Sequence, residues 1–254
     1  MHHIPGCDGQ LSGLGREYED TAEVPFRAHM EIPGMLRAIG GVAGLAVLDA
    51  GCGTGLYARM LARRGGSPVV GIAASAGMLA TARGLEQREP LGIDHRVGDL
   101  TLAQGLSVNA VAACYLLPYA RAEADLTAMC QSLATALRPG GRLVTAVINP
   151  DFSNDPQWYR AYGFSLTTAG QHAEGDPVVL SVAQAELIFE VTAYHGNRPT
   201  VESALWKAGF TEISWTRLQV SQEGVEGYGR AFWDNYLARP HALIVVAQRA
   251  GDSA

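Results

Sequence analysis

The chain has 254 residues, of which 48% are hydrophobic and 17% are charged, and its formal net charge is -6. This composition predicts one large globular domain and excludes a typical nucleic-acid binder, because such proteins usually carry a basic stripe. The longest apolar run, residues 242–247, is too short to cross a membrane. The four cysteines form no CxxC pair and no zinc spacing, so we expect free thiols, no metal and a reducing compartment, the cytoplasm.

The first predicted elements are two short helices between residues 16 and 40. Apolar side chains that include Met30 and Ile39 indicate a buried face on these helices. The dipeptide Pro33-Gly34 predicts a break between them, since both residues interrupt helical hydrogen bonding.

A glycine-rich turn follows. The sequence VLDAGCGTG, from Val47 to Gly55, joins a short apolar strand to a helix through three glycines at alternate positions. Glycine permits a tight turn and lets a ligand lie against the backbone, at the sheet edge where α/β proteins bind ligands. A dinucleotide site would need glycine at position 56, which is leucine, and a P-loop would need a lysine. Asp49, two residues before the first glycine, instead favours a cationic ligand.

Helical and strand-like segments then alternate as far as residue 148. This rhythm is typical of an α/β fold with a parallel sheet. The segment LRPGGRL, from Leu137 to Leu143, predicts a turn that ends a helix and leads into a strand. The expected strands cover residues 45–48, 69–72, 93–97, 108–115 and 143–148, and the helices between them cover 56–64, 75–85 and 121–137.

Two of these segments carry a family resemblance. VLDAGCGTG resembles the first motif of class I S-adenosylmethionine-dependent methyltransferases, and LRPGGRL resembles a second signature of that family. Their cofactor carries an ammonium and a sulfonium, which suits an acidic turn. The segments YED, PFR, YLLPY and INP look most like bacterial small-molecule methyltransferases, such as the toxoflavin-type N-methyltransferases. The resemblance extends over residues 18–248.

The resemblance implies a Rossmann-like α/β fold with helices on both faces of a mostly parallel sheet, whose last strand runs antiparallel. Lid helices would occupy residues 1–40, and the cofactor-binding half residues 41–149. Residues 150–199 interrupt the alternation with aromatic and β-like segments, which predict a small antiparallel cap insertion. Residues 200–254 would complete the same sheet with strands at 213–220 and 242–247.

The resemblance also implies where S-adenosyl-L-methionine binds. Asp99 would accept a hydrogen bond from the adenine amino group, and Tyr18 of the lid would contact the cofactor. The complete expected set of cofactor residues is Tyr18, Asp49, Gly51, Cys52, Gly53, Ala73, Ala74, Met78, Asp99, Leu100 and Cys114.

Ala73 departs from the family pattern. An aspartate or glutamate about 20 residues beyond the glycines usually binds both ribose hydroxyls. Because a hydrogen bond to a charged group contributes about 1.5–3 kcal/mol, its absence predicts cofactor binding roughly tenfold weaker than usual.

Four aromatic residues are candidates for acceptor binding: Tyr115, Tyr119, Trp158 and Tyr162. The alternative for those in the cap is that they form its own small core. A heteroaromatic nitrogen needs no strong base, whereas a phenol usually needs one. His195, at the end of a cap strand, and His29, on the lid, are the first candidates for a catalytic base; His172 and His241 rank below them.

We therefore expect a methyltransferase that acts on the nitrogen or oxygen of a small aromatic or heteroaromatic natural product. One alternative is an enzyme of the same fold that holds the cofactor for structure and catalyses a cyclisation. Another is a ligand-binding or regulatory subunit. The expected partner is a small molecule, not nucleic acid or membrane, and a homodimer is plausible.

Overall fold

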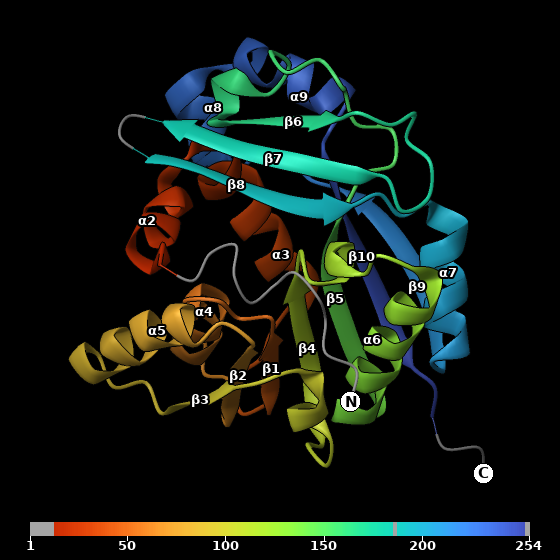
Figure 1. Ribbon diagram of the computed structural model, residues 1–254. Helices are drawn as coiled ribbons and strands as arrows, with labels where there is room; N and C mark the ends of the chain where they lie inside the picture. Colours follow the sequence, from red (N-terminus) through yellow and green to blue (C-terminus); the bar gives the residue numbers. More distant parts are fainter. Residues whose placement is uncertain (1–12, 185–186, 252–254) are drawn as a thin grey trace.

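The computed structural model describes residues 13–184 and 187–251 (Figure 1). Its main feature is a seven-stranded sheet in the order β3-β2-β1-β4-β5-β10-β9. All neighbouring strands are parallel except β10, which runs antiparallel to both β5 and β9. The predicted mostly parallel sheet with an antiparallel last strand is confirmed. The strands are β1 (Val47–Ala50), β2 (Val69–Ala73), β3 (Ile93–Val97), β4 (Val108–Cys114), β5 (Leu137–Ile148), β9 (Phe210–Arg217) and β10 (Ala242–Arg249).

Helices cover both faces of this sheet, and an apolar cluster lies under each layer. One layer comprises α3 (Ile32–Ile39), α4 (Leu56–Arg63) and α5 (Ala76–Arg88), and the other α6 (Glu123–Ala136) and α7 (Arg198–Lys207). The central strand β1 is buried along its whole length, as expected for a parallel strand covered on both sides. The carboxyl ends of the parallel strands therefore all open at one edge.

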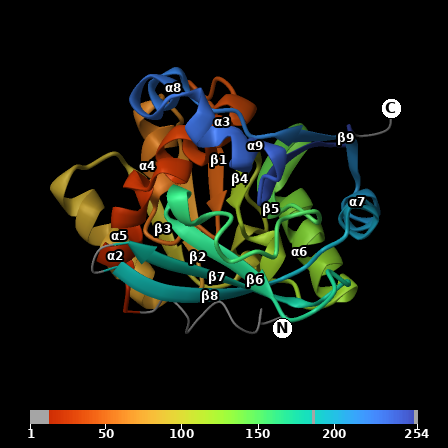
Figure 2. The same cartoon turned by 90° about the horizontal axis from the view of Figure 1, so that it is seen from above.

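A second sheet covers that edge (Figures 1 and 2). It has three antiparallel strands in the order β6-β7-β8, comprising Phe164–Thr168, Pro177–Gln184 and Leu187–Tyr194. The predicted pair corresponds to β7 and β8. Strand β6 was not predicted, although its residues alternate between buried and half-buried, which is the usual sign of a strand. The short helices α8 (Gln222–Tyr228) and α9 (Asp234–Ala238) lie at the same end of the molecule.

The predicted break at Pro33-Gly34 is wrong. Helix α3 contains both residues and continues a helical segment that runs over residues 25–39, because packing of its apolar face outweighs the N–H that Pro33 lacks. A π-helical turn, η2 (Arg27–Glu31), leads directly into α3. The chain instead turns after α2 (Gly15–Asp20) and the 3₁₀ turn η1 (Thr21–Glu23), where Val24 is extended before a proline.

The predicted turn after α6 is only partly correct. The helix ends at Ala136, but β5 already begins at Leu137 and pairs irregularly with β4 before its regular part starts at Arg142. Gly140 makes this irregular segment possible, with a φ of +72°.

Cys52, Cys114 and Cys130 are free thiols, whereas Cys7 lies outside the described residues. Within the described part of the chain, no helix combines the length and hydrophobicity needed to cross a bilayer.

Candidate active site

The glycine turn between β1 and α4 forms an open backbone surface. Gly51, Gly53 and Gly55 have φ values of +73°, +55° and +78°, in a region that strains other residues. The Gly51 and Cys52 N–H groups donate to the Ile72 carbonyl of β2, at 2.8 and 3.0 Å, which fixes the turn to the sheet. A Cβ atom on Gly53 would lie 3.3 Å from Met78 Cε. Glycine therefore keeps the slot between the turn and α5 open for a ligand.

Asp49 lies under this turn and is only 2% exposed. Its Oδ2 accepts a hydrogen bond of 2.8 Å from the Ala58 N–H, which fixes the first turn of α4. Burial raises the pKa of Asp49 to about 7, although this hydrogen bond and the Arg59 guanidinium oppose the rise. A cation bound at the turn would therefore be stabilised by a carboxylate in a poorly solvated environment.

Helix α2 is attached to the glycine turn. Glu19 accepts hydrogen bonds from the Thr54 hydroxyl and from Arg59 Nη2, whose guanidinium also donates to the Thr54 carbonyl at 2.6 Å. The neighbouring Tyr18 ring consequently reaches to 3.9 Å from where a Gly53 Cβ would be. The N-terminal segment thus covers the turn, and Tyr18 lies against it.

The other predicted cofactor residues lie at the ends of β2, β3 and β4. Ala73 packs with Cys52, Leu79 and Ala82, while Met78 and Leu100 are buried and Ala74 is half-buried. The Asp99 carboxylate accepts hydrogen bonds from the N–H and hydroxyl of Thr101, at the start of a 3₁₀ turn. Burial raises the pKa values of Cys52 and Cys114, so both remain neutral thiols. These residues suit a nucleoside, apart from the missing acid at position 73.

A separate cavity of about 110 Å³ lies between the cap sheet and the edge of the main sheet. Its walls are mainly apolar and come largely from the cap, including Phe164, Leu166, Val178 and Val191. Tyr18 also lines this cavity. One side chain therefore contacts both the glycine turn and the cavity.

Tyr115 and Tyr119 line the cavity, whereas Trp158 and Tyr162 do not. The Tyr162 hydroxyl donates to the Phe232 carbonyl at 2.8 Å, and its ring stacks on Trp233. Trp158 Nε1 donates to the Asn235 carbonyl at 3.0 Å. These contacts join the cap to the C-terminal helices, so the structure supports the alternative that Trp158 and Tyr162 are packing residues.

Tyr115 has an unusual backbone conformation, with a φ of +53°. Such a conformation is strained for a bulky residue and often occurs at functional sites. The Tyr115 hydroxyl lies 3.2 Å from Nε2 of His241, whose Nδ1 lies 2.9 Å from the Tyr236 hydroxyl. Burial lowers the pKa of His241 to about 3, so its imidazole is neutral. Sequence reasoning ranked His241 low, yet it is the histidine that lines the cavity.

His29 and His195, the predicted catalytic histidines, lie outside the cavity. His29 Nδ1 is 3.3 Å from Ser221 Oγ, and its ring contacts Tyr228 and Trp233. His195 is buried, with Nε2 3.1 Å from the Pro150 carbonyl. The structure therefore brings neither histidine to the acceptor cavity, and their catalytic role stays a prediction.

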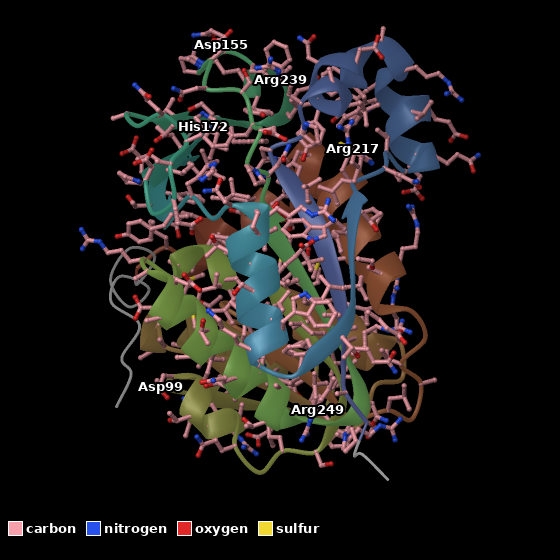
Figure 3. All side chains as sticks on the ribbon, turned by 90° about the vertical axis from the view of Figure 1, so that its right-hand side faces the viewer. Asp99, Asp155, His172, Arg217, Arg239 and Arg249 are labelled. Carbon is pink, nitrogen blue, oxygen red and sulfur yellow. The ribbon has the colours of Figure 1, made fainter. Side chains whose placement is uncertain are left out.

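An open groove of about 830 Å³ lies on the outer side of the cap. It is lined by His172, Arg198, Arg217 and Arg239, three of which are labelled in Figure 3. The Pro150 carbonyl, which lines this groove, accepts from His172 as well as from His195.

The polar end of the cavity is formed by the lid. Arg27 and Glu31, both buried, pair with an Nε–Oε1 distance of 3.0 Å, and the Tyr57 hydroxyl donates to the same Glu31 oxygen at 2.9 Å. Arg27 also donates to the Thr21 hydroxyl, and its guanidinium lies 5.0 Å from the centre of the Tyr18 ring. Arg27 and Glu31 lie on the π-helical turn η2, a distortion that is frequent at functional sites.

Comparison with known families identifies part of this architecture. Residues 47–141 match the family model described as a methyltransferase domain. This range contains the glycine turn, the ends of β2 and β3, and the Tyr115 segment. It excludes the lid and the cap.

Curated relatives include ubiquinone biosynthesis O-methyltransferases. The protein of Acinetobacter baumannii (strain AYE) is 34% identical over 114 residues, which cover 43% of this chain and 46% of that protein. The protein of Xanthomonas axonopodis pv. citri (strain 306) is 34% identical over 110 residues, which cover 42% of this chain and 44% of that protein. The match thus spans less than half the length of these relatives.

Solved structures share the fold over nearly the whole chain. An S-adenosylmethionine-dependent methyltransferase from Mesorhizobium loti has a TM-score of 0.62 and 20% identity, covering 90% of this chain and 100% of that one. The CcbJ methyltransferase from Streptomyces caelestis has a TM-score of 0.63 and 17% identity, covering 98% and 100%. The [4+2]-cyclase SpnF has a TM-score of 0.61 and 16% identity, covering 99% and 100%. Because the sequence identities to these structures are low, the similarity establishes the fold alone.

Residues 47–141 are thus similar to a methyltransferase domain, and the chain as a whole shares its fold with proteins named as S-adenosylmethionine-dependent methyltransferases.

Proposed function

We propose that this protein is an S-adenosylmethionine-dependent methyltransferase that methylates a small aromatic or heteroaromatic molecule. The observation that carries the proposal is the cavity between the cap and the sheet edge, which Tyr18 connects to the glycine turn. A site enclosed in this way suits a small molecule better than a macromolecule.

The cofactor would be held by the backbone at Gly51 and Gly53, with Asp49 beneath its cationic part. Asp99 would bind the base, and Tyr18 would cover the cofactor from the lid. When bound, the cofactor supplies an electrophilic methyl group on a sulfonium.

The acceptor would lie in the apolar cavity, against Tyr115 and Tyr119. The walls exclude water and restrict the acceptor's orientation, and both effects favour a near-attack arrangement in a displacement reaction. The strained backbone at Tyr115 supports its place in this site, because such strain persists where function needs one particular orientation.

Two observations bear on the methylated atom. Resemblance to toxoflavin-type enzymes favours a nitrogen of a natural product, as in secondary metabolism and antibiotic biosynthesis. The curated relatives are named as O-methyltransferases, which favours oxygen. The proposed function therefore includes both nitrogen and oxygen acceptors.

A cyclisation without methyl transfer is the second candidate. It is favoured by the fold shared with the [4+2]-cyclase SpnF and by the missing ribose-binding acid at Ala73. Product mass distinguishes the two candidates, because methylation adds one methyl group and cyclisation adds none.

The proposal can be tested with methyl-labelled S-adenosylmethionine and a panel of phenols and nitrogen heterocycles. We expect label transfer by the wild type and its loss in Asp49→Ala, which removes the carboxylate beneath the turn. Wild-type turnover by Asp49→Ala would contradict the site assignment. A product of unchanged mass would favour the cyclase.

A further inference from the structure

Glu31 is the only acid that lines the acceptor cavity in the described part of the chain, and it is 1% exposed. Burying a carboxylate and a guanidinium costs free energy that their mutual attraction often fails to offset. Apolar residues of similar size at positions 27 and 31 would extend the apolar wall at lower cost. The Arg27–Glu31 pair is therefore better explained by a function than by stability.

The two oxygens of Glu31 have different surroundings. Arg27 Nε and the Tyr57 hydroxyl both donate to Oε1, at 3.0 and 2.9 Å. No described residue donates a hydrogen bond to Oε2, and Oε2 is not among the fully enclosed atoms that lack a partner. The carboxylate is therefore fixed through Oε1, while Oε2 has no donor among the described residues, and Glu31 lines the cavity.

The other polar groups that line the cavity are poor proton acceptors. Burial raises the pKa of Tyr18 to about 12 and that of Tyr115 well above its usual value, so both hydroxyls stay protonated. His241 is held between two tyrosine hydroxyls, and burial lowers its pKa to about 3. Arg27 has no acceptor atom. Among the described residues that line the cavity, Glu31 is the only carboxylate, and a carboxylate accepts protons more readily than a hydroxyl or a guanidinium does.

We propose that Glu31 Oε2 binds an aromatic hydroxyl of the acceptor and takes its proton as the oxygen is methylated. This inference rests on the proposed function and narrows its acceptors to phenols and enols. Arg27 neutralises the charge of Glu31, so the cavity gives no strong preference for a cationic amine. A neutral hydroxyl, in contrast, needs a group that receives its proton.

The proton and electrons of this reaction balance. The O–H bond of the acceptor breaks and its proton passes to Oε2. The oxygen forms a bond to the methyl carbon, and the carbon–sulfur bond breaks with its electron pair remaining on sulfur. Glu31 then returns the proton to solvent when the cavity opens, and the pair with Arg27 is restored.

A binding experiment tests the proposal without turnover. The probes are para-nitrophenol, kept at a pH where it is neutral, and para-nitrotoluene, in which a methyl group of nearly the same size replaces the hydroxyl. By calorimetry, we expect the wild type to bind the phenol about tenfold to a hundredfold more tightly, as for a buried hydrogen bond to a charged group.

Glu31→Gln places an amide donor near the cavity and should abolish this preference, whereas the exposed control Glu23→Gln should retain it. Equal affinity for the two probes in the wild type would overturn the proposal, and so would a preference retained in Glu31→Gln. If Glu31→Gln does not fold, equal affinity of the wild type for the two probes still overturns the proposal.

Cofactor affinity and turnover separate this proposal from the proposed function. We expect Glu31→Gln to bind S-adenosylmethionine as the wild type does, but to lose most of kcat with phenolic acceptors. Loss of cofactor binding would assign Glu31 to the cofactor site and overturn its role toward the acceptor. If the wild type prefers the phenol but transfers no methyl group, the proposed function is refuted. The binding of a hydroxyl at Glu31 would still stand.

Discussion

At the scale of single residues, Asp49 shows a conflict between stability and binding. Burial raises its pKa from 3.8 to about 7, so the folded state binds a proton more tightly than the unfolded state does. The stability of the fold should therefore fall as pH rises from about 4 to about 7. The cost arises because the charged carboxylate is poorly solvated under the turn, which is also what makes it useful to a cationic ligand.

Asp49→Asn should remove this cost, because an amide can still accept the hydrogen bond from the Ala58 N–H. We expect the free energy of unfolding of the variant to exceed that of the wild type by roughly 2–4 kcal/mol at pH 8, and the two values to be close at pH 4. Urea unfolding at the two pH values measures this difference. A gap that does not widen with pH would mean that Asp49 is not the titrating group.

Ala73 is a second residue of the proposed cofactor site, and it departs from the pattern of the methyltransferases that the sequence resembles. Its methyl group lies among Cys52, Leu79 and Ala82, and none of these side chains can replace a carboxylate toward the ribose. The site therefore lacks one charge-assisted hydrogen bond.

Ala73→Asp should tighten S-adenosylmethionine binding about tenfold, since it restores that hydrogen bond. Ala74→Asp, one position along and half-buried, is the matched control and should give no gain. Calorimetry measures both affinities. If neither variant binds more tightly, another group already satisfies the ribose.

At the scale of elements, the lid depends on a small number of polar contacts. Helix α2 has only six residues, which is too short to be stable alone. Glu19 attaches it to Thr54 and Arg59 at the start of α4. Helix α2, which covers the glycine turn, is therefore held in place by residues at the end of that turn and in α4.

Glu19→Gln should loosen α2, because its ion pair with Arg59 is lost. We expect trypsin to cleave after the exposed Arg16 several-fold faster, as local opening becomes about 1 kcal/mol easier. Time courses on gels measure the rate, and Glu17→Gln, at an exposed position on the same helix, is the control. Equal cleavage of all three proteins would show that α2 is held by other contacts.

At the scale of the whole molecule, the site is assembled from three parts that are distant in sequence. The main sheet supplies the glycine turn and the strand ends, the cap supplies apolar walls, and the lid supplies Tyr18, Arg27 and Glu31. The matched methyltransferase domain, residues 47–141, contains only the first part. The turn proposed for the cofactor lies within the matched range, whereas the lid and the cap, which supply most of the cavity walls, lie outside it.

The family resemblance implied the antiparallel last strand, whereas the sequence by itself determined the α/β class and the glycine turn. These features depend on local signals, namely apolar runs, glycines at fixed spacing and the helix end at LRPGGRL. Tyr115 and Tyr119 were predicted to lie at the ligand-binding edge of the sheet, because they directly follow a strand whose carboxyl end lies there.

Only the tertiary structure decided which polar residues face the cavity. Glu31 and His241 are 210 positions apart, and neither has a local pattern that indicates its role. Trp158 and Tyr162 are aromatic residues typical of binding surfaces, yet both bond to the C-terminal helices outside the cavity. The physical reason is that strand and turn formation depend on neighbours in sequence, whereas the direction and charge state of a buried side chain depend on whatever the fold places around it.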